Sequence, residues 1–331
     1  MKKTIYIWCN DISKSSGEGI LANKFIDDLK KYNKNYNCII KIPNSKSFAL
    51  LRTILGSIID RFLLPFLGVL YLWSIFLTKK NKKLCFVNFL PLWNFTTFAL
   101  IPPNTIIGPI TGGSKFLKKP LLNYIIREYI FNIFYKISIS ILKIRRRKIL
   151  FSTSLLKKII PKKNKNYYFD YVLKDFKFKK SKNKKKFDLI FYLRCHKNKN
   201  TILQNKLANS LSSEFKIITI GNKINNKSIL NLGNISRSGV RTILKKTKFA
   251  FLSSENLLSF FSLDCLENGT YIFYNNQERP NRKTLKNSIP LNYSNYEKLY
   301  KIIRNKLKNK YKKPSVIDLK TNNKFCNYFR I

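Results

Sequence analysis

The stretch KFAFLSSENLLSFFSLDCLENGTYIFY, residues 248–274, decides the fold class of the second half of the chain. The runs at its two ends, 248–253 and 270–274, are almost continuously apolar, which is typical of strands buried on both faces of a sheet. Between them, Ser259 as an N-cap and Gly269 just past the last turn predict a helix. A strand, a helix and another strand in this order form the repeating unit of a parallel sheet.

The same alternation continues toward the middle of the chain. Apolar runs at 187–193 and 215–221 predict two further strands, and the segments near 201–212 and 237–246 predict helices between them. The helix of the first stretch spans about 260–268 on the same reasoning. We therefore expect the second half to be a Rossmann-like α/β domain with a parallel sheet covered on both faces.

The chain has 331 residues, more than one ordinary core holds, so we expect two domains. The first half opens with a predicted strand over 4–8, a glycine-bearing loop at 13–25 and a helix that ends near Tyr32. A Lys- and Asn-rich stretch, poor in aliphatic residues, separates the halves. The expected domains are an N-terminal Rossmann-like domain over 1–160, a linker over 161–186, and a C-terminal Rossmann-like domain over 187–331.

The charge of the chain is strongly unbalanced: 65 Lys and Arg face 16 Asp and Glu, a formal net charge of +49. Lysine that accompanies many Asn and Ile is also what an AT-rich genome produces, so charge alone selects no function. A field this positive attracts nucleic acid, anionic lipid or phosphorylated substrates. The sequence has no RNP, KH, zinc or helix-turn-helix signature. We expect no specific nucleic-acid partner, and a basic nucleic-acid-binding protein stays an alternative.

The cysteines and the histidine of the sequence limit the cellular compartment and the metal sites that we expect. The six cysteines are scattered without a C-x-x-C pair, which favours a reduced, cytoplasmic protein. His196 is the single histidine, so zinc clusters built on several histidines are excluded. We expect no metal and no cofactor.

Two apolar stretches of the first half, 48–77 and 121–148, carry Lys and Arg at their edges. The longest uncharged part, 62–78, contains Pro65 and Gly68 and is shorter than the roughly 20 apolar residues that a spanning helix needs. A buried helix pair, an interfacial helical surface and a span all stay open. Two such stretches in one domain favour peripheral contact with an anionic membrane surface.

Polar residues follow the predicted strands of the second domain, at the edge where open parallel sheets bind ligands. Strand by strand, they are Arg194 and Lys199, Gly221 and Asn222, and Ser254 and Glu255. A diphosphate needs cations at such an edge, and arginine offers a planar fork while lysine offers a point charge. Without further support, these cations would be ordinary solvated loop residues of a Lys-rich chain.

Residues 187–275 resemble the donor-binding domain of glycosyltransferase family 4, whose members have the GT-B fold. Arg194 and Lys199 have the family's spacing of Arg, four residues and Lys, with Asn200 at the following glycine position. The segment SLDCLENGTYIF resembles the family's Leu-Glu-Ala-Met-Ala-x-Gly segment, with Asp264 in the glutamate place and Gly269 in the glycine place. Glu255 and Asp264 have eight residues between them where the family has seven, so the chain would be a divergent member.

The resemblance implies roles for these side chains in binding a nucleoside diphosphate sugar. Arg194 and Lys199 would hold the diphosphate and stabilise it as it leaves, Glu255 would accept hydrogen bonds from the sugar, and Asp264 would bind the ribose hydroxyls. Gly221, Asn222 and Ser254 would line the same donor site. As structural alternatives, Glu255 caps a turn and Asp264 occupies a surface helix position. We expect the neighbouring Glu267 to face solvent.

The first domain offers two glycine loops. Gly17 and Gly19 follow the first strand, where GT-B enzymes bring a glycine loop to donor and acceptor, so we assign them to donor binding and Glu18 to the acceptor side. Gly112 and Gly113 follow a later strand and would form a second acceptor-side loop. An ordinary tight turn explains each loop as well.

The predicted fold is therefore α/β, a GT-B arrangement of two Rossmann-like domains with parallel sheets that face each other across a cleft. The resemblance implies a retaining hexosyltransferase that moves a sugar from a nucleoside diphosphate sugar to a lipid-linked or cell-surface polysaccharide acceptor. We expect it to be cytoplasmic and peripheral on the inner face of the cytoplasmic membrane. A catalytically inactive GT-B-like scaffold of polysaccharide assembly is a further alternative.

Overall fold

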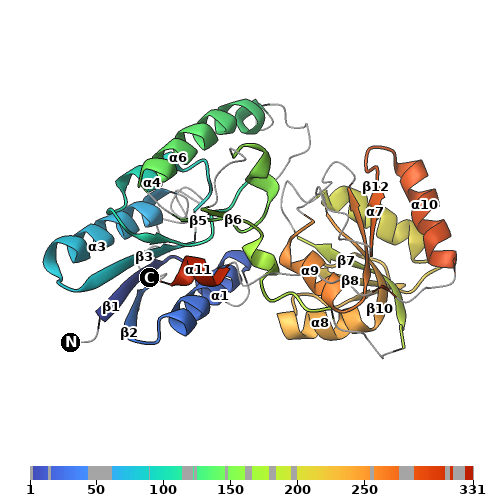
Figure 1. Cartoon of the computed structure of the whole chain (residues 1–331). Helices are drawn as coiled ribbons and strands as arrows, with labels where there is room; N and C mark the ends of the chain where they lie inside the picture. The colour runs from blue at the N-terminus through green and yellow to red at the C-terminus, as the bar shows by residue number, and fades with distance from the viewer. Residues whose placement is uncertain are drawn as a thin grey trace. The chain divides into compact units, whose positions relative to one another are not determined.

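The computed structural model divides the chain into two compact units (Figure 1). The first comprises Met1–Gly113, Leu121–Lys174 and Thr321–Ile331, and the second Ser114–Pro120 and Asp175–Lys320. The residues that the structure describes are 3–13, 16–43, 62–88, 90–113, 122, 125–145, 148–160, 166–178, 184–194, 200–253, 257–275, 287–309, 314–315 and 325–330.

The unit boundaries differ from the predicted domains in three places, and the first is Ser114–Pro120, which belongs to the second unit although it lies within the predicted domain 1–160. The predicted linker 161–186 divides at Lys174, with its first part in the first unit and its second part in the second. The last residues, Thr321–Ile331, belong to the first unit although they follow the second in sequence. The chain therefore returns to its first core at the end.

The sheet of the first unit is parallel throughout, with strand order β2-β1-β3-β4. Its strands are β1 (Lys3–Cys9), β2 (Tyr36–Lys41), β3 (Lys82–Val87) and β4 (Ile106–Ile107). A short parallel pair, β5 (Ile149–Leu150) and β6 (Tyr167–Tyr168), continues from it through an isolated bridge between Ile110 and Phe151. The strand predicted over 4–8 is confirmed as β1.

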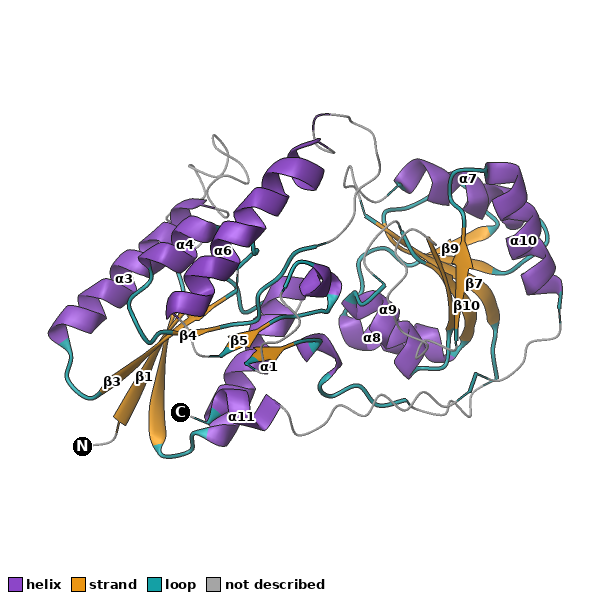
Figure 2. Ribbon diagram, turned by 45° about the horizontal axis from the view of Figure 1, so that its top comes forward, coloured by secondary structure: helices purple, strands orange, loops and turns teal. Residues whose placement is uncertain are grey.

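Helices cover both faces of this sheet. On one face, α1 (Gly17–Tyr32) and α11 (Cys326–Phe329) pack together, and the buried Phe25 of α1 contacts Phe329 with ring centroids 5.2 Å apart. On the other face, α3 (Leu64–Thr78), α4 (Phe95–Leu100) and α6 (Phe131–Arg145) lie side by side (Figures 1 and 2), and a short π-helical turn, η3 (Ile126–Ile130), leads into α6. Two 3-10 turns, η4 (Leu155–Lys158) and η5 (Tyr171–Leu173), complete the unit.

The apolar segment 62–78 forms α3, which packs its inner side on the sheet through Val69 and Leu72. Across the parts of the chain that the structure describes, no helix combines the length and the apolar character that crossing a bilayer requires.

The second unit has a six-stranded parallel sheet with strand order β12-β11-β10-β7-β8-β9. Its strands are β7 (Phe187–Leu193), β8 (Ile217–Gly221), β9 (Ile229–Asn231), β10 (Thr247–Phe251), β11 (Tyr271–Asn275) and β12 (Ser288–Leu291). The four predicted strands of this domain are confirmed as β7, β8, β10 and β11. Strands β9 and β12 were not predicted, because they are short and carry no long apolar run.

Helices pack on both faces of this sheet as well (Figure 2). They are α7 (Thr201–Leu211), α8 (Arg237–Lys245), α9 (Phe260–Glu267) and α10 (Tyr296–Lys308). Helices α7 and α10 bury Leu207 and Ile303 against the same side of the sheet as Phe191, while α8 and α9 pack on each other. The predicted α/β class with parallel sheets is confirmed in both units.

Candidate functional site

The strand order of the second unit turns around at β7. This strand pairs with β8 on one side and with β10 on the other, and the chain builds the sheet outward in both directions from it. In such a sheet the helices that follow β7 and β10 leave toward opposite faces, and ligands bind beyond the carboxyl ends of the strands at that point. The carboxyl ends of β7 and β10 are therefore the candidate site of this unit.

Arg194 lies directly after β7 and is exposed, and its guanidinium is 5.8 Å from the centre of the Tyr192 ring. Phe261, in the first turn of α9, packs on the same ring, and the centroids of the Phe261 and Tyr192 rings are 5.1 Å apart. One ring thus contacts both a cation and the first turn of a helix. The structure therefore brings Arg194 and the amino end of α9 to one place at the end of β7.

The amino end of α9 is well defined. Ser259 is its N-cap, and the Ser259 hydroxyl accepts a hydrogen bond from the Ser262 backbone N–H. The N–H groups at the start of a helix have no acceptor within the helix and carry the positive end of its dipole. An anionic group beyond β7 would meet these N–H groups and Arg194 together. Ser259 was correctly predicted as the N-cap.

Gly221, at the end of β8, has a structural reason to be glycine. Its φ is +88°, and a Cβ on it would lie 2.0 Å from the Leu193 carbonyl oxygen. The next residue, Asn222, donates its backbone N–H to that carbonyl over 3.0 Å, so β8 turns tightly against the end of β7. Gly221 and Asn222 thus lie at the predicted edge, beside the residue that precedes Arg194.

Two arginines of the same unit bind the Asp264 carboxylate, and the predicted contact of Asp264 with a ribose stays a prediction. Its side chain is 3% exposed, and its two carboxylate oxygens accept hydrogen bonds from Arg237 and Arg241 of α8. Arg237 binds through two nitrogens, over 2.7 and 2.9 Å, and Arg241 through Nε over 2.8 Å. The Asp264 carboxylate therefore joins α8 to α9, and because it is buried it does not occupy the surface helix position of the structural alternative.

Glu267 is also not the solvent-facing residue that we predicted. Its side chain is 15% exposed, and its Oε2 lies 3.3 Å from Arg241. Burial raises the pKa of Glu267, while Arg241 acts in the opposite direction. The acids of α9 thus neutralise the arginines of α8. Sequence reasoning missed Arg237 and Arg241, although their spacing of four residues places them on one face of a helix.

Lys199, Ser254 and Glu255 lie outside the described residues, so their predicted roles stay predictions. Within the described parts of the chain, no group of three His, Cys, Asp or Glu side chains could hold a metal ion.

The first unit gathers polar side chains at the carboxyl ends of its own central strands. Asn88, after β3, accepts a hydrogen bond from the Asn10 backbone N–H over 2.9 Å and donates to the Asp11 carbonyl. Its φ is +56°, in the left-handed region that asparagine tolerates. Cys9 is buried here, and burial raises the pKa of its thiol to about 12, so it is not a nucleophile at neutral pH. Asn88 therefore joins the ends of β1 and β3.

Asp11 organises the loop between β1 and α1. Its Oδ1 accepts the Ser13 backbone N–H over 2.6 Å, and its Oδ2 accepts the hydroxyl of Ser16. Ser16 in turn caps α1 by accepting the Gly19 N–H over 2.8 Å. Sequence reasoning assigned no role to Asp11, and the signal for one was its place directly after the first strand.

The predicted glycines of the first unit lie in these turns. Gly17 is the exposed first residue of α1, Glu18 follows it in the first turn, and Gly19 is buried. A Cβ on Gly19 would lie 2.2 Å from the Ser13 carbonyl oxygen, so close packing of the loop requires this glycine. Gly112 and Gly113 follow β4 with φ of +127° and +79°. These observations support the tight-turn explanation of both loops and leave their assignment to donor and acceptor untested.

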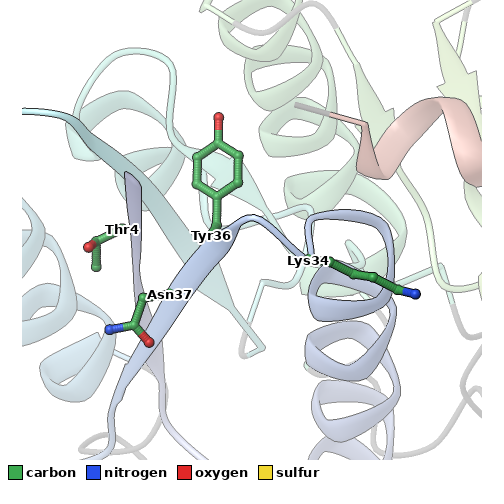
Figure 3. A pocket seen from close by; sticks show the side chains of 4 residues that line it. All are labelled: Thr4, Lys34, Tyr36 and Asn37. Carbon is green, nitrogen blue, oxygen red and sulfur yellow. The ribbon is translucent and has the colours of Figure 1, made fainter. Parts of the chain in front are cut away.

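A hollow of about 380 Å³ lies elsewhere on the first unit (Figure 3). It is lined by Thr4, Lys34, Tyr36 and Asn37, which belong to the first residues of β1 and β2 and to the turn before β2. This is the amino end of the parallel sheet, opposite to the edge at which such sheets bind ligands. We do not include it in the candidate site.

Comparison with known proteins supports the fold. No family model matches the chain, and a search of curated proteins finds no match. Among solved structures, the UDP-GlcNAc 2-epimerase of Methanocaldococcus jannaschii in complex with UDP-GlcNAc and UDP has 13% identity and a TM-score of 0.52, over 100% of this chain and 98% of that one. A second structure of that enzyme has 11% identity and a TM-score of 0.51, over 99% and 98% of the chains.

Two further solved structures have lower TM-scores. A UDP co-structure of MnaA from S. aureus has 12% identity and a TM-score of 0.49, over 93% of this chain and 89% of that one. An alpha-glucosyltransferase in complex with UDP-glucose and DNA has 11% identity and a TM-score of 0.45, over 92% and 90%. At these identities the likeness to the two epimerase structures concerns the fold alone. The chain has the predicted GT-B fold.

Proposed function

We propose that this GT-B chain is a glycosyltransferase that takes a sugar from a nucleoside diphosphate sugar. The observation that carries the proposal is the shared contact of Arg194 and the first turn of α9 with Tyr192, at the point where the sheet of the second unit turns around. That point is where a Rossmann-like sheet binds nucleotides. A cation and helical N–H groups are the groups that a diphosphate requires there.

The chemistry assigned to this site is electrostatic. As the bond between the sugar and the diphosphate breaks, negative charge grows on the leaving phosphate oxygens. The Arg194 guanidinium and the N–H groups of α9 would stabilise that charge without moving, which lowers the barrier more than any other contribution we can assign. By resemblance to glycosyltransferase family 4, Lys199 would add a second cation and Glu255 would bind the sugar. This chemistry requires neither a metal nor a cofactor.

The finer features of the proposal also rest on that resemblance. They are transfer of a hexose with retention, a lipid-linked or cell-surface polysaccharide as acceptor, and a cytoplasmic location on the inner face of the membrane. Asp264 is not part of the proposed donor site, because Arg237 and Arg241 occupy its carboxylate.

Nucleotide binding is the first test. We expect one of UDP, GDP or ADP to raise the melting temperature of the protein by several degrees, since a ligand at about 100 times its Kd contributes about 2.7 kcal/mol. Arg194→Ala should abolish the rise. Lys216→Ala is the matched control, because Lys216 is an exposed cation at the amino end of β8, on the opposite edge of the same sheet. An equal rise in both variants would refute the role of Arg194.

Product analysis then separates the candidate functions. Release of free nucleoside diphosphate that depends on an acceptor supports transfer, whereas a change in the sugar with the nucleotide still attached would show an epimerase. Binding without turnover would show the inactive scaffold. A mobility shift with DNA that outlasts moderate salt, without any nucleotide effect on melting, would favour the nucleic-acid-binding alternative.

A further inference from the structure

The layer formed by α3, α4 and α6 on the first unit exposes large apolar side chains. Six of them lie on α3 and α6: Phe66, Leu70 and Leu77 are 48%, 51% and 76% exposed, and Ile133, Ile137 and Ile144 are 58%, 39% and 86% exposed. We call these six residues the α3/α6 face. Scattered exposed apolar residues are ordinary, but a contiguous set of this size marks an interaction surface.

On each helix the residues of the α3/α6 face form one stripe. With 3.6 residues per turn, Phe66, Leu70 and Leu77 fall within roughly 40° of one another around α3. Ile133, Ile137 and Ile144 do the same around α6. These stripes point away from the sheet, because Val69 and Leu72 of α3 and Ile139 and Leu142 of α6 are the residues that pack into the core.

The helices that carry the two stripes are joined through α4 and the residues beside it. The ring of Trp93 lies 5.5 Å from that of Phe62, just before α3, and 5.5 Å from that of Phe131, at the start of α6. Near the other end, Trp73 of α3 donates to the Leu100 carbonyl over 2.7 Å, and Arg145 of α6 donates to the Ile101 carbonyl over 2.8 Å. Helix α4 therefore lies between α3 and α6 and contacts both, as Figures 1 and 2 show.

The charge around this face is almost entirely positive. Lys136 and Lys143 of α6 are exposed and lie beside the isoleucine stripe, and Lys79 and Lys80 are exposed at the end of α3. Glu128 is the only acidic residue of the sequence between Arg61 and Phe169. An apolar face bordered by cations complements a bilayer with anionic headgroups, where apolar side chains enter the interface and lysines meet the phosphates.

We propose that the α3/α6 face binds the surface of an anionic lipid bilayer, with its apolar stripes at the level of the headgroups and the first acyl carbons. The lysines of α6 and those after α3 contact lipid phosphates. This inference goes beyond the proposed transfer reaction, because the binding needs neither donor nor acceptor. It also assigns the membrane contact to one surface of the first unit.

The test is flotation of the full chain with vesicles of neutral phosphatidylcholine or of phosphatidylcholine with about one third phosphatidylglycerol. The wild type should bind the anionic vesicles and bind the neutral ones at least ten-fold more weakly, since each lysine near an anionic surface contributes about 1 kcal/mol. The combined variant Phe66→Gln, Leu70→Gln and Ile133→Gln should bind anionic vesicles at least ten-fold more weakly. Glutamine keeps the helix propensity, and unchanged melting temperatures confirm the fold.

The second unit provides a control for the variant of the α3/α6 face. Ile202→Gln with Leu230→Gln removes two exposed apolar side chains of the second unit, 85% and 47% exposed, and should leave vesicle binding unchanged. Lys136→Gln with Lys143→Gln should reduce the preference for anionic vesicles. The proposal is refuted if the wild type floats with neither vesicle, if it binds both equally, or if the face variant binds like the control. A wild type that is dimeric by sedimentation, with a monomeric face variant, would assign the face to a second copy instead and overturn it.

Discussion

At the scale of single residues, the contacts of the Asp264 carboxylate bear directly on its predicted role. Sequence resemblance placed it on a ribose, whereas the structure places it between two arginines of α8. A buried carboxylate whose two oxygens both accept hydrogen bonds stabilises a helix pair. Removing it takes the Asp264 acceptor from Arg237 and Arg241, and Arg241 keeps only Glu267. The structural role and the ribose-binding role of Asp264 therefore predict different effects of its substitution on stability and on nucleotide binding.

Replacing Asp264 with Asn should lower stability and leave nucleotide binding in place. Hydrogen bonds between charged groups contribute about 1.5–3 kcal/mol, so we expect a loss of about 2–3 kcal/mol. Because Arg237 and Arg241 are 30% and 39% exposed, solvent screening keeps the loss below that of a fully buried pair. The measurement is the melting temperature with and without the nucleotide that binds.

Glu297→Gln serves as the control, because Glu297 is an exposed acid in the first turn of α10 and should change stability by less than about 1 kcal/mol. If Asp264→Asn melted like the wild type and lost the nucleotide response, the ribose-binding role would be right and the structural one wrong.

At the scale of elements, the helices of the second unit are held by ion pairs near the ends of α7 and α10. Glu214, in the turn after α7, accepts two hydrogen bonds from Arg304 of α10, over 2.6 and 2.8 Å, and lies 3.1 Å from Lys308. Hydrogen bonds from Arg304 and then from Lys308 lower the pKa of Glu214 to about 2. These ion pairs lie at the surface, so their contribution to the stability of the fold depends on the salt concentration.

The lowered pKa of Glu214 predicts a pH dependence of stability. A carboxyl group whose pKa falls on folding stabilises the fold above its unfolded pKa of 4.5, and this contribution is lost as pH falls from about 4.5 toward about 2. The difference in melting temperature between wild type and Glu214→Gln should therefore shrink between pH 5 and pH 3, and 1 M salt should reduce it at pH 5. A difference that does not change with pH would contradict the assignment.

At the scale of the whole molecule, the end of the chain belongs to the core of the first unit. Phe329 is fully buried, and its ring lies 5.2 Å from that of Phe25, 5.7 Å from that of Tyr32 and 5.9 Å from that of Tyr171. Its carbonyl accepts a hydrogen bond from the Asn33 side chain over 2.7 Å. The core of the first unit is therefore complete only when Phe329 packs into it.

Replacing Phe329 with Ala should destabilise the first unit and leave the second largely unaffected. Truncation of a buried phenylalanine costs about 3–5 kcal/mol. Hydrogen exchange is the suitable measurement, because it reports each unit separately. We expect faster exchange in α1 and β1 and unchanged exchange in β7, β8 and β10. A uniform increase through both units would mean that they unfold together, and an unchanged α1 would contradict the packing.

Much of the fold followed from the pattern of residues. The apolar runs predicted β1, β7, β8, β10 and β11, because strands buried on both faces need continuous apolar sequence wherever they lie in the sheet. Ser259 and Gly269 predicted the limits of α9, since capping depends on neighbouring residues alone. Arg194 and Gly221 were predicted at the carboxyl edge because Arg194 directly follows a strand and Gly221 ends one.

The remaining features depended on contacts between residues far apart in the chain. The strand order that puts β7 beside β10, the return of Phe329 to Phe25, and the partners of Asp264 are set by packing and charge pairing, which local sequence does not encode. The same holds for the α3/α6 face: the sequence determined that these segments are apolar and flanked by cations. Only the tertiary structure decided which side of each helix packs on the sheet and which side is left to solvent.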